Sequence, residues 1–212
     1  MTRRHVVFTG TGRTGTSFLV ELLTHLGLDT GFAPEDLARH KSAMARAGFE
    51  HDIRSADAPF IVKSPWFCDY CDEILCRDDI AIDHVYIPMR DSTAAAESRR
   101  YVSQQTIAAF PIWKRMRFLL SNQSVAGGFW HAKRGGQQEE VLLGQVYKLV
   151  LALSRTMVPV TLLQYPLIVN DPMYLFEKLL PVLGSTTFHE FESTHSRVAR
   201  KDLVHSFSPN DR

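Results

Sequence analysis

Glycine and hydroxyl residues crowd one short segment near the start of the chain, Thr9-Gly10-Thr11-Gly12-Arg13-Thr14-Gly15-Thr16-Ser17. The β-branched run His5–Thr9 leads into it, and the helical apolar spacing of Thr16–Leu26 follows it. Glycines let the backbone turn so tightly that successive N–H groups point into one concavity, and a helix N-terminus adds partial positive charge. The pattern predicts a loop that holds a phosphate-like anion, with the Thr16 and Ser17 hydroxyls as further donors.

This segment departs from the usual nucleotide-triphosphate loop at one position. Gly10 and Gly15 have the G-x-x-x-x-G spacing, but Thr16 stands where a lysine should follow. The cation within the loop is Arg13 instead. An enzyme that acts on ATP or GTP needs that lysine on the β- and γ-phosphates. Its absence counts against the alternative interpretation, a P-loop kinase or nucleotidase.

The run Arg13-Thr14-Gly15-Thr16-Ser17-Phe18 resembles the 5′-phosphosulfate loop of sulfotransferases, where a basic residue precedes a small residue, Gly, two hydroxyl residues and an aromatic. The resemblance implies 3′-phosphoadenosine 5′-phosphosulfate as the donor, with no metal required. Arg13 would reach the bridging oxygen and the sulfuryl group, and Phe18 would lie by the adenine. The backbone of Thr14 to Ser17 would hold the 5′-phosphate, and Gly12 is also expected among the donor-binding residues. Arg in place of the usual Lys makes leaving-group stabilisation mainly electrostatic.

A second segment resembles the 3′-phosphate motif of the same family, in which a strand ends in Arg-Asp and a Ser follows on the next helix. Arg90 and Asp91 end an apolar strand pattern, and Ser98 comes eight residues after Arg90, which is the family's spacing. Alone, these residues also fit a helix cap and an ordinary helical hydroxyl. Together with the loop at Arg13 they favour a second anion contact.

The C-terminal part resembles the family's closing unit. A strand precedes Tyr165, and Asp171-Pro172 begins a helix that ends at Leu183-Gly184. The tail Ser196–Lys201 resembles the family's final basic loop, so Arg200 is expected near the 3′-phosphate; a solvated basic tail fits that stretch equally well.

The catalytic base departs from the family pattern, because Pro65 stands where many sulfotransferases have a histidine. Lys63, at the end of the second predicted strand, is expected to contact the sulfuryl oxygens. The acceptor hydroxyl or amine needs a base within hydrogen-bond reach, and Glu35 is the residue we expect in that role. The same part of the chain also offers Asp36, His40 and His51.

The candidate site residues can meet only if strands and helices alternate along the chain, and the rest of the sequence shows that alternation. Strands are expected at His5–Thr9, Pro59–Lys63, His84–Met89 and Val160–Gln164. Helices are expected at Thr16–Leu26, up to about Leu75, at Asp91–Gln104, at Glu139–Met157 and from Pro172 to about Leu183. The pattern predicts an α/β fold, a P-loop-type three-layer α/β/α domain with a central parallel sheet. It spans 1–212, with a substrate or lid segment at about 106–138.

Composition narrows the function classes. The 212 residues suit one domain, and 24 Lys and Arg against 23 Asp and Glu give a net charge of +1. A nucleic-acid partner is therefore not expected. The sequence shows no signal peptide and no membrane span, so the expected location is the cytoplasm.

Two further observations bear on ligands. Cys68 and Cys71 form a C-x-x-C with Cys76 nearby, but no second ligand pair accompanies them, so semi-buried thiols on a helix are expected rather than a metal site. Aromatic residues suit a small-molecule or glycan acceptor, although core packing explains them as well. A non-catalytic nucleotide-binding protein of the same fold is the other alternative.

Overall fold

Four strands form one sheet in the computed structural model, which describes residues 2–40, 48–113 and 137–204. The strands are β1 (Arg3–Phe8), β2 (Ile61–Lys63), β3 (Ile80–Met89) and β4 (Val160–Gln164). Their order is β2-β1-β3-β4, and every neighbouring pair is parallel. β1 therefore lies inside the sheet, between β2 and β3.

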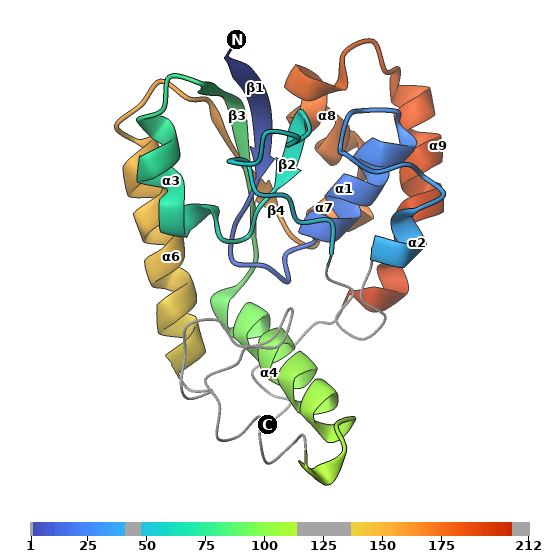
Figure 1. Ribbon diagram of the computed structural model, residues 1–212. Helices are drawn as coiled ribbons and strands as arrows, with labels where there is room; N and C mark the ends of the chain where they lie inside the picture. The colour runs from blue at the N-terminus through green and yellow to red at the C-terminus, as the bar shows by residue number, and fades with distance from the viewer. Residues whose placement is uncertain (1, 41–47, 114–136, 205–212) are drawn as a thin grey trace.

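Helices lie on both sides of this sheet (Figure 1). The side of α1 (Thr16–His25) also carries α7 (Leu167–Asn170), α8 (Pro172–Leu183) and α9 (Phe188–Val198). The other side carries α3 (Phe67–Leu75) and α6 (Gln138–Leu153). The expected α/β fold with a parallel central sheet is confirmed, and helices on both faces are consistent with three layers.

The remaining elements are shorter or lie at the sheet's end. α4 (Ser92–Ala108) begins just beyond the carboxyl end of β3 and runs away from the sheet (Figure 1). The short helix α2 (Leu37–His40) and the 3₁₀ turn η2 (Lys201–Leu203) complete the described elements. No helix in the described ranges is long and apolar enough to cross a membrane.

Alternating strand residues build two apolar cores, one on each face of the sheet. On β1, Val6 and Phe8 pack against the α1 side, whereas Val7 packs against the α3 and α6 side. Both neighbouring strands are buried on both faces as well, as expected for a parallel sheet covered by helices. This double covering fixes the carboxyl ends of the strands, where the candidate site lies.

Local signals explain where several helices begin and end. The Asp171 carboxylate accepts the Tyr174 N–H at 3.0 Å and Pro172 follows at the first helical position, so α8 begins as predicted. α1 ends before Gly27, whose φ of 78° suits glycine.

The structure also corrects some expected boundaries. α4 continues to Ala108, and α6 ends at Leu153 rather than Met157. The tail expected as a basic loop is partly helical, since α9 runs to Val198. Of the expected lid segment at 106–138, residues 114–136 lie outside the described residues.

Candidate anion-binding site

The glycine loop (residues 9–15) leaves the carboxyl end of β1 and enters α1. Its first peptide continues the sheet, because the Thr9 N–H donates to the Tyr86 carbonyl at 3.0 Å. The chain passes from β1 to β2 on one side and later returns to β3 on the other. The loop therefore lies at the topological switch point, where open parallel sheets place their ligands.

At two loop positions, Gly12 and Gly15, neighbouring atoms leave no space for a side chain. Gly15 has a φ of 83°, and a Cβ there would lie 2.9 Å from Ile168 Cδ1 and 3.2 Å from the Tyr165 ring. At Gly12, φ is 64° and a Cβ would lie 2.7 Å from the Arg99 Nη2. Arg13 also adopts a positive φ, of 60°, which is unusual for a residue with a side chain. The loop backbone is thus held in a conformation that most sequences do not adopt.

Arg13, Arg90 and Ser98, which belong to two separate predicted motifs, meet beside this loop. The Arg13 Nε donates to the Ser98 Oγ at 3.1 Å, across 85 residues of sequence. The Arg90 Nη1 donates to the Arg13 carbonyl at 3.1 Å. The Arg90 guanidinium also lies 4.8 Å from the centre of the Tyr165 ring, and burial lowers its pKa. Two cations therefore converge at the carboxyl edge between β1 and β3.

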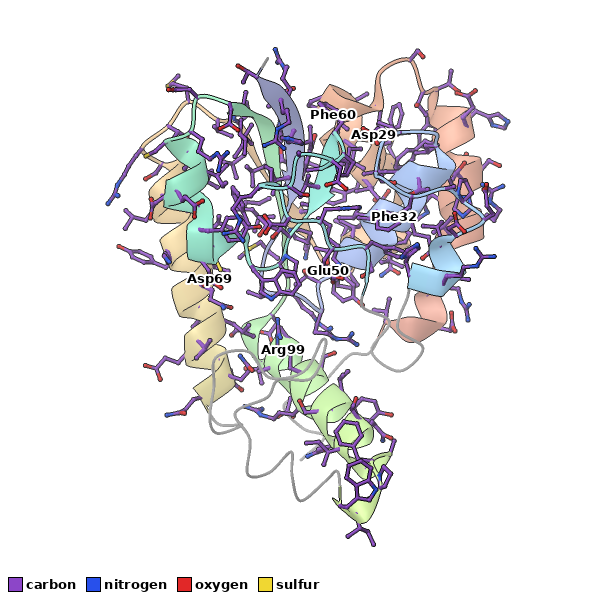
Figure 2. The ribbon with its side chains drawn as sticks, viewed as in Figure 1. Asp29, Phe32, Glu50, Phe60, Asp69 and Arg99 are labelled. Carbon is purple, nitrogen blue, oxygen red and sulfur yellow. The ribbon has the colours of Figure 1, made fainter. Side chains whose placement is uncertain are left out.

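A third arginine, which the sequence did not single out, lies beneath the loop. Arg99 is only 3% exposed and donates from its Nη2 to the Thr11 carbonyl. Burial, and secondarily the charge of Arg13, lower its pKa to about 10, so it stays protonated at neutral pH. Figure 2 shows Arg99 on α4, beyond the carboxyl ends of the strands.

Lys63 joins the other end of the loop. Its Nζ donates to the Ser17 Oγ at 2.9 Å, to the Gly48 carbonyl, and to the Glu50 Oε1 at 2.9 Å. The Lys63 side chain is 4% exposed and that of Glu50 is 24% exposed. Sequence reasoning missed Glu50, because a single acid in Gly48-Phe49-Glu50 carries no spacing signal. Glu50 is labelled in Figure 2 at the same end of the sheet as Arg99.

Three predicted residues, Glu35, Phe18 and Arg200, make no described contact with Arg13, Arg90, Ser98 or Lys63. The Glu35 side chain is exposed before α2 and has no hydrogen bond or ion pair among the described residues. Arg200 is exposed and pairs with Asp202 at 3.1 Å. Phe18 packs edge-on against His195, with ring centres 5.5 Å apart. Within the loop and α1, Thr14 and Thr16 are buried, and the Thr14 Oγ1 lacks a hydrogen-bond partner in the described structure.

The other residues considered as bases, Asp36, His40 and His51, contact residues of their own part of the chain. Asp36 pairs with Arg39 at 2.9 Å. His40 and His51 both pack on the Phe32 ring, at centroid distances of 5.1 and 4.8 Å. Burial lowers the pKa of His51. The His51 Nε2, however, is buried without a hydrogen-bond partner in the described structure.

Candidate metal ligands have explanations of the same kind. The Asp91 carboxylate accepts the Ala94 N–H at 2.8 Å and so caps α4. Cys68 and Cys71 are buried free thiols, and burial raises the pKa of each to about 12. Within the described residues, no three His, Cys, Asp or Glu side chains form a group that could hold a metal ion.

The site continues toward α6 through a small cavity of about 40 Å³. Arg90 lies at the junction, since it contacts the loop and also lines this cavity. The lining combines the loop and α4 with apolar side chains of α6: Thr11, Met89, Arg90, Ser92, Ala95, Leu142, Leu143 and Val146. The structure thus defines an α/β protein with a cationic, glycine-rich loop at the carboxyl edge of its sheet.

Comparison with protein-family models and with curated proteins gave no match for this chain. A functional assignment therefore rests on the site geometry and on the motif resemblance.

Proposed function

We propose that this protein is a sulfotransferase, which moves a sulfuryl group from 3′-phosphoadenosine 5′-phosphosulfate to a hydroxyl or amine of a small-molecule or glycan acceptor. The observation that carries the proposal is the meeting of Arg13, Arg90 and Ser98. These residues belong to two motifs whose sequence patterns resemble the 5′-phosphosulfate and 3′-phosphate sites of that family. Their contacts at 3.1 Å support a single site for the two anionic groups of one nucleotide, its 3′-phosphate and its 5′-phosphosulfate.

The donor set suits such an anion. Guanidinium groups bind phosphate and sulfate oxygens through several N–H donors, and Arg13 and Arg90 supply two of them. The N-terminus of α1 adds backbone N–H groups and partial positive charge. In this assignment the loop and Ser17 hold the 5′-phosphosulfate, while Arg90 and Ser98 hold the 3′-phosphate.

For sulfuryl transfer, the protein mainly has to position the two substrates and stabilise negative charge. A bond forms between the acceptor oxygen or nitrogen and sulfur, and the bond from sulfur to the bridging phosphate oxygen breaks. Arg13 would stabilise the negative charge that develops on that oxygen. Lys63 would contact the sulfuryl oxygens once its present hydrogen bonds rearrange.

The acceptor proton needs a base, and Glu50 is better placed than Glu35 to take it. Glu50 lies against Lys63 at 2.9 Å, whereas Glu35 is exposed and makes no described contact with the cluster. If Glu50 is the base, Glu50→Gln lowers turnover by about 10²-fold or more, and Glu35→Gln does not. The opposite result would restore Glu35 to the role expected from the sequence.

Calorimetric titration of adenosine 3′,5′-bisphosphate, the reaction product, tests the donor site without requiring an acceptor. We expect metal-independent, micromolar-range binding that is stronger than binding of ATP. Arg90→Ala should weaken it about tenfold or more, since one charge-assisted contact is lost. Arg77→Ala is the matched control, because Arg77 pairs with Asp79 near the amino end of β3, away from the site.

The outcomes separate the alternatives. Preference for ATP with Mg²⁺ would overturn the proposal in favour of a P-loop kinase or phosphotransferase. Tight binding of the bisphosphate without turnover on any acceptor would favour a non-catalytic nucleotide-binding protein. Failure to bind either nucleotide would remove the donor assignment altogether.

A further inference from the structure

Arg99 differs from every other arginine of the site in its degree of burial. Its guanidinium lies under the glycine loop, with 3% of the residue exposed, and it is close enough to Arg13 for that charge to lower its pKa. Burying a cation next to another cation is unfavourable. A buried cation in this position therefore needs a compensating interaction, and the adjacent glycine loop is where we expect it.

The hydrogen bond from Arg99 to the loop fixes the direction in which peptide groups of the loop point. Its Nη2 donates to the Thr11 carbonyl, and Arg90 Nη1 donates to the Arg13 carbonyl two residues on. In a planar trans peptide the carbonyl and the following N–H point in opposite directions. Holding these two carbonyls toward the guanidiniums therefore turns the Gly12 and Thr14 N–H groups away from them.

The absence of a side chain at Gly12 allows the Arg99 guanidinium to lie against the loop. A Cβ at that position would lie 2.7 Å from the Arg99 Nη2, so a side chain there would displace the guanidinium. Gly12 itself remains partly exposed, although Arg99 below it is buried. The Gly12 N–H is therefore turned away from the Arg99 guanidinium, at a residue that solvent partly reaches.

We propose that Arg99 is a positioning residue: it holds the Thr11 carbonyl and so keeps the Gly12 N–H directed at the bound anion. Its charge adds to the positive potential of Arg13 and Arg90 at the same place. The identity of the anion rests on the proposed function, but the effect of Arg99 on the loop does not. The two can therefore be tested separately.

Limited trypsin digestion of the ligand-free protein tests the effect on the loop, because the loop contains a trypsin site after Arg13. In Arg99→Met we expect cleavage after Arg13 to be about five- to tenfold faster than in the wild type, relative to cleavage after the exposed Arg200. Arg100→Met is the matched control, since Arg100 is the next residue of α4 but pairs with Glu97 and Glu139. Mass spectrometry quantifies each cleavage.

Titration of inorganic sulfate and of adenosine 3′,5′-bisphosphate tests the effect on the anion. Arg99→Met should weaken binding about tenfold, with its ligand-free melting temperature close to that of the wild type. Arg99→Lys should recover part of the affinity because it keeps the charge, and Gly12→Ala should reproduce the loss. Arg100→Met should bind as the wild type does.

Equal cleavage after Arg13 in Arg99→Met and Arg100→Met would overturn the proposal. So would a lower melting temperature with unchanged anion affinity, because Arg99 would then serve packing alone. If Arg99→Met does not fold, Gly12→Ala and Arg99→Lys carry the same comparison. If the wild type binds neither anion, the proposed function fails, and the cleavage rates alone decide whether Arg99 holds the loop.

Discussion

The ion pair between Lys63 and Glu50 lies at the carboxyl end of β2, where the lysine side chain has almost no access to solvent. Its Nζ is surrounded by three oxygen atoms, from Ser17, Gly48 and Glu50. A buried ammonium depends on such partners, because removing one of them leaves charge without compensation in a poorly solvated place. Glu50 consequently stabilises the folded protein, whether or not it also acts as the catalytic base.

We expect Glu50→Gln to lower the free energy of unfolding by about 1–3 kcal/mol, since Lys63 then keeps its charge beside a neutral amide. Urea denaturation at pH 7 measures the change. Glu73→Gln is the control, because Glu73 is 53% exposed and lies 3.8 Å from Arg54. That variant should lose less than about 0.5 kcal/mol. An equal loss of unfolding free energy in the two variants would show that the buried Lys63–Glu50 pair stabilises the protein no more than an exposed pair does.

Sequence reasoning at this scale depended on motifs. Arg13, Arg90 and Ser98 could be selected because glycine spacing and an Arg-to-Ser interval mark them, and the structure brings them together. Arg99 and Glu50 carry no such mark. Arg99 looks like any helical arginine until its burial is known, and Glu50 reaches Lys63 only through the path of the chain before β2.

At the scale of elements, the junction between the glycine loop and α1 is the most constrained point. Gly15 is the N-cap of α1, with no side-chain cap, and it packs against Tyr165 and Ile168 from the segment after β4. The start of α1 is thereby fixed by the closing unit of the fold. A side chain at this position would disturb both elements at once.

Gly15→Ala should lower stability by about 1–3 kcal/mol, because alanine is strained at positive φ and its Cβ would contact Ile168. Gly144→Ala is the opposite case, since Gly144 lies within α6 and a Cβ there would meet no neighbouring atom within 4 Å. There we expect a gain of about 0.5–1 kcal/mol from helix propensity. Thermal unfolding of both variants is the measurement, and a similar shift of the same sign in both would contradict this explanation.

Most elements could be predicted because their local signals agree with the fold. β4 and α8 have the expected bounds, and Asp171 and Pro172 begin α8 as predicted. α9 was missed, since His195 occupies a core position in its apolar stripe and interrupts the pattern. The Thr187–Glu190 capping box was a signal that could have revealed it.

At the scale of the whole molecule, buried histidines are distributed over the sheet and one helix layer. His5 on β1 contacts the Pro59 carbonyl at 2.7 Å, His84 on β3 contacts the Thr161 hydroxyl at 2.7 Å, and His195 on α9 contacts the Ile168 carbonyl at 3.0 Å. Burial lowers the pKa of each of the three. In the unfolded chain they would take up protons at higher pH than in the folded protein.

Stability should therefore be fully present above about pH 6.5, the ordinary histidine pKa, and fall as the pH drops through the lowered values. We expect a loss on the order of 1 kcal/mol between pH 7.5 and pH 5 from these residues. Urea denaturation at several pH values measures it. His195→Gln should reduce the slope, while the exposed His189→Gln should leave it unchanged. A slope unaffected by His195→Gln would assign the pH dependence to other groups.

The interior position of β1 has a consequence for how the chain reaches its folded state. Both strands that pair with β1 are made much later in the chain: β2 contributes Ile61–Lys63 on one side, and β3 contributes Ile80–Tyr86 on the other. During translation its apolar residues stay without partners while that intervening chain is synthesised, and long-range parallel pairing of this kind is slow. This strand is thus the segment that a nascent-chain chaperone would be expected to protect.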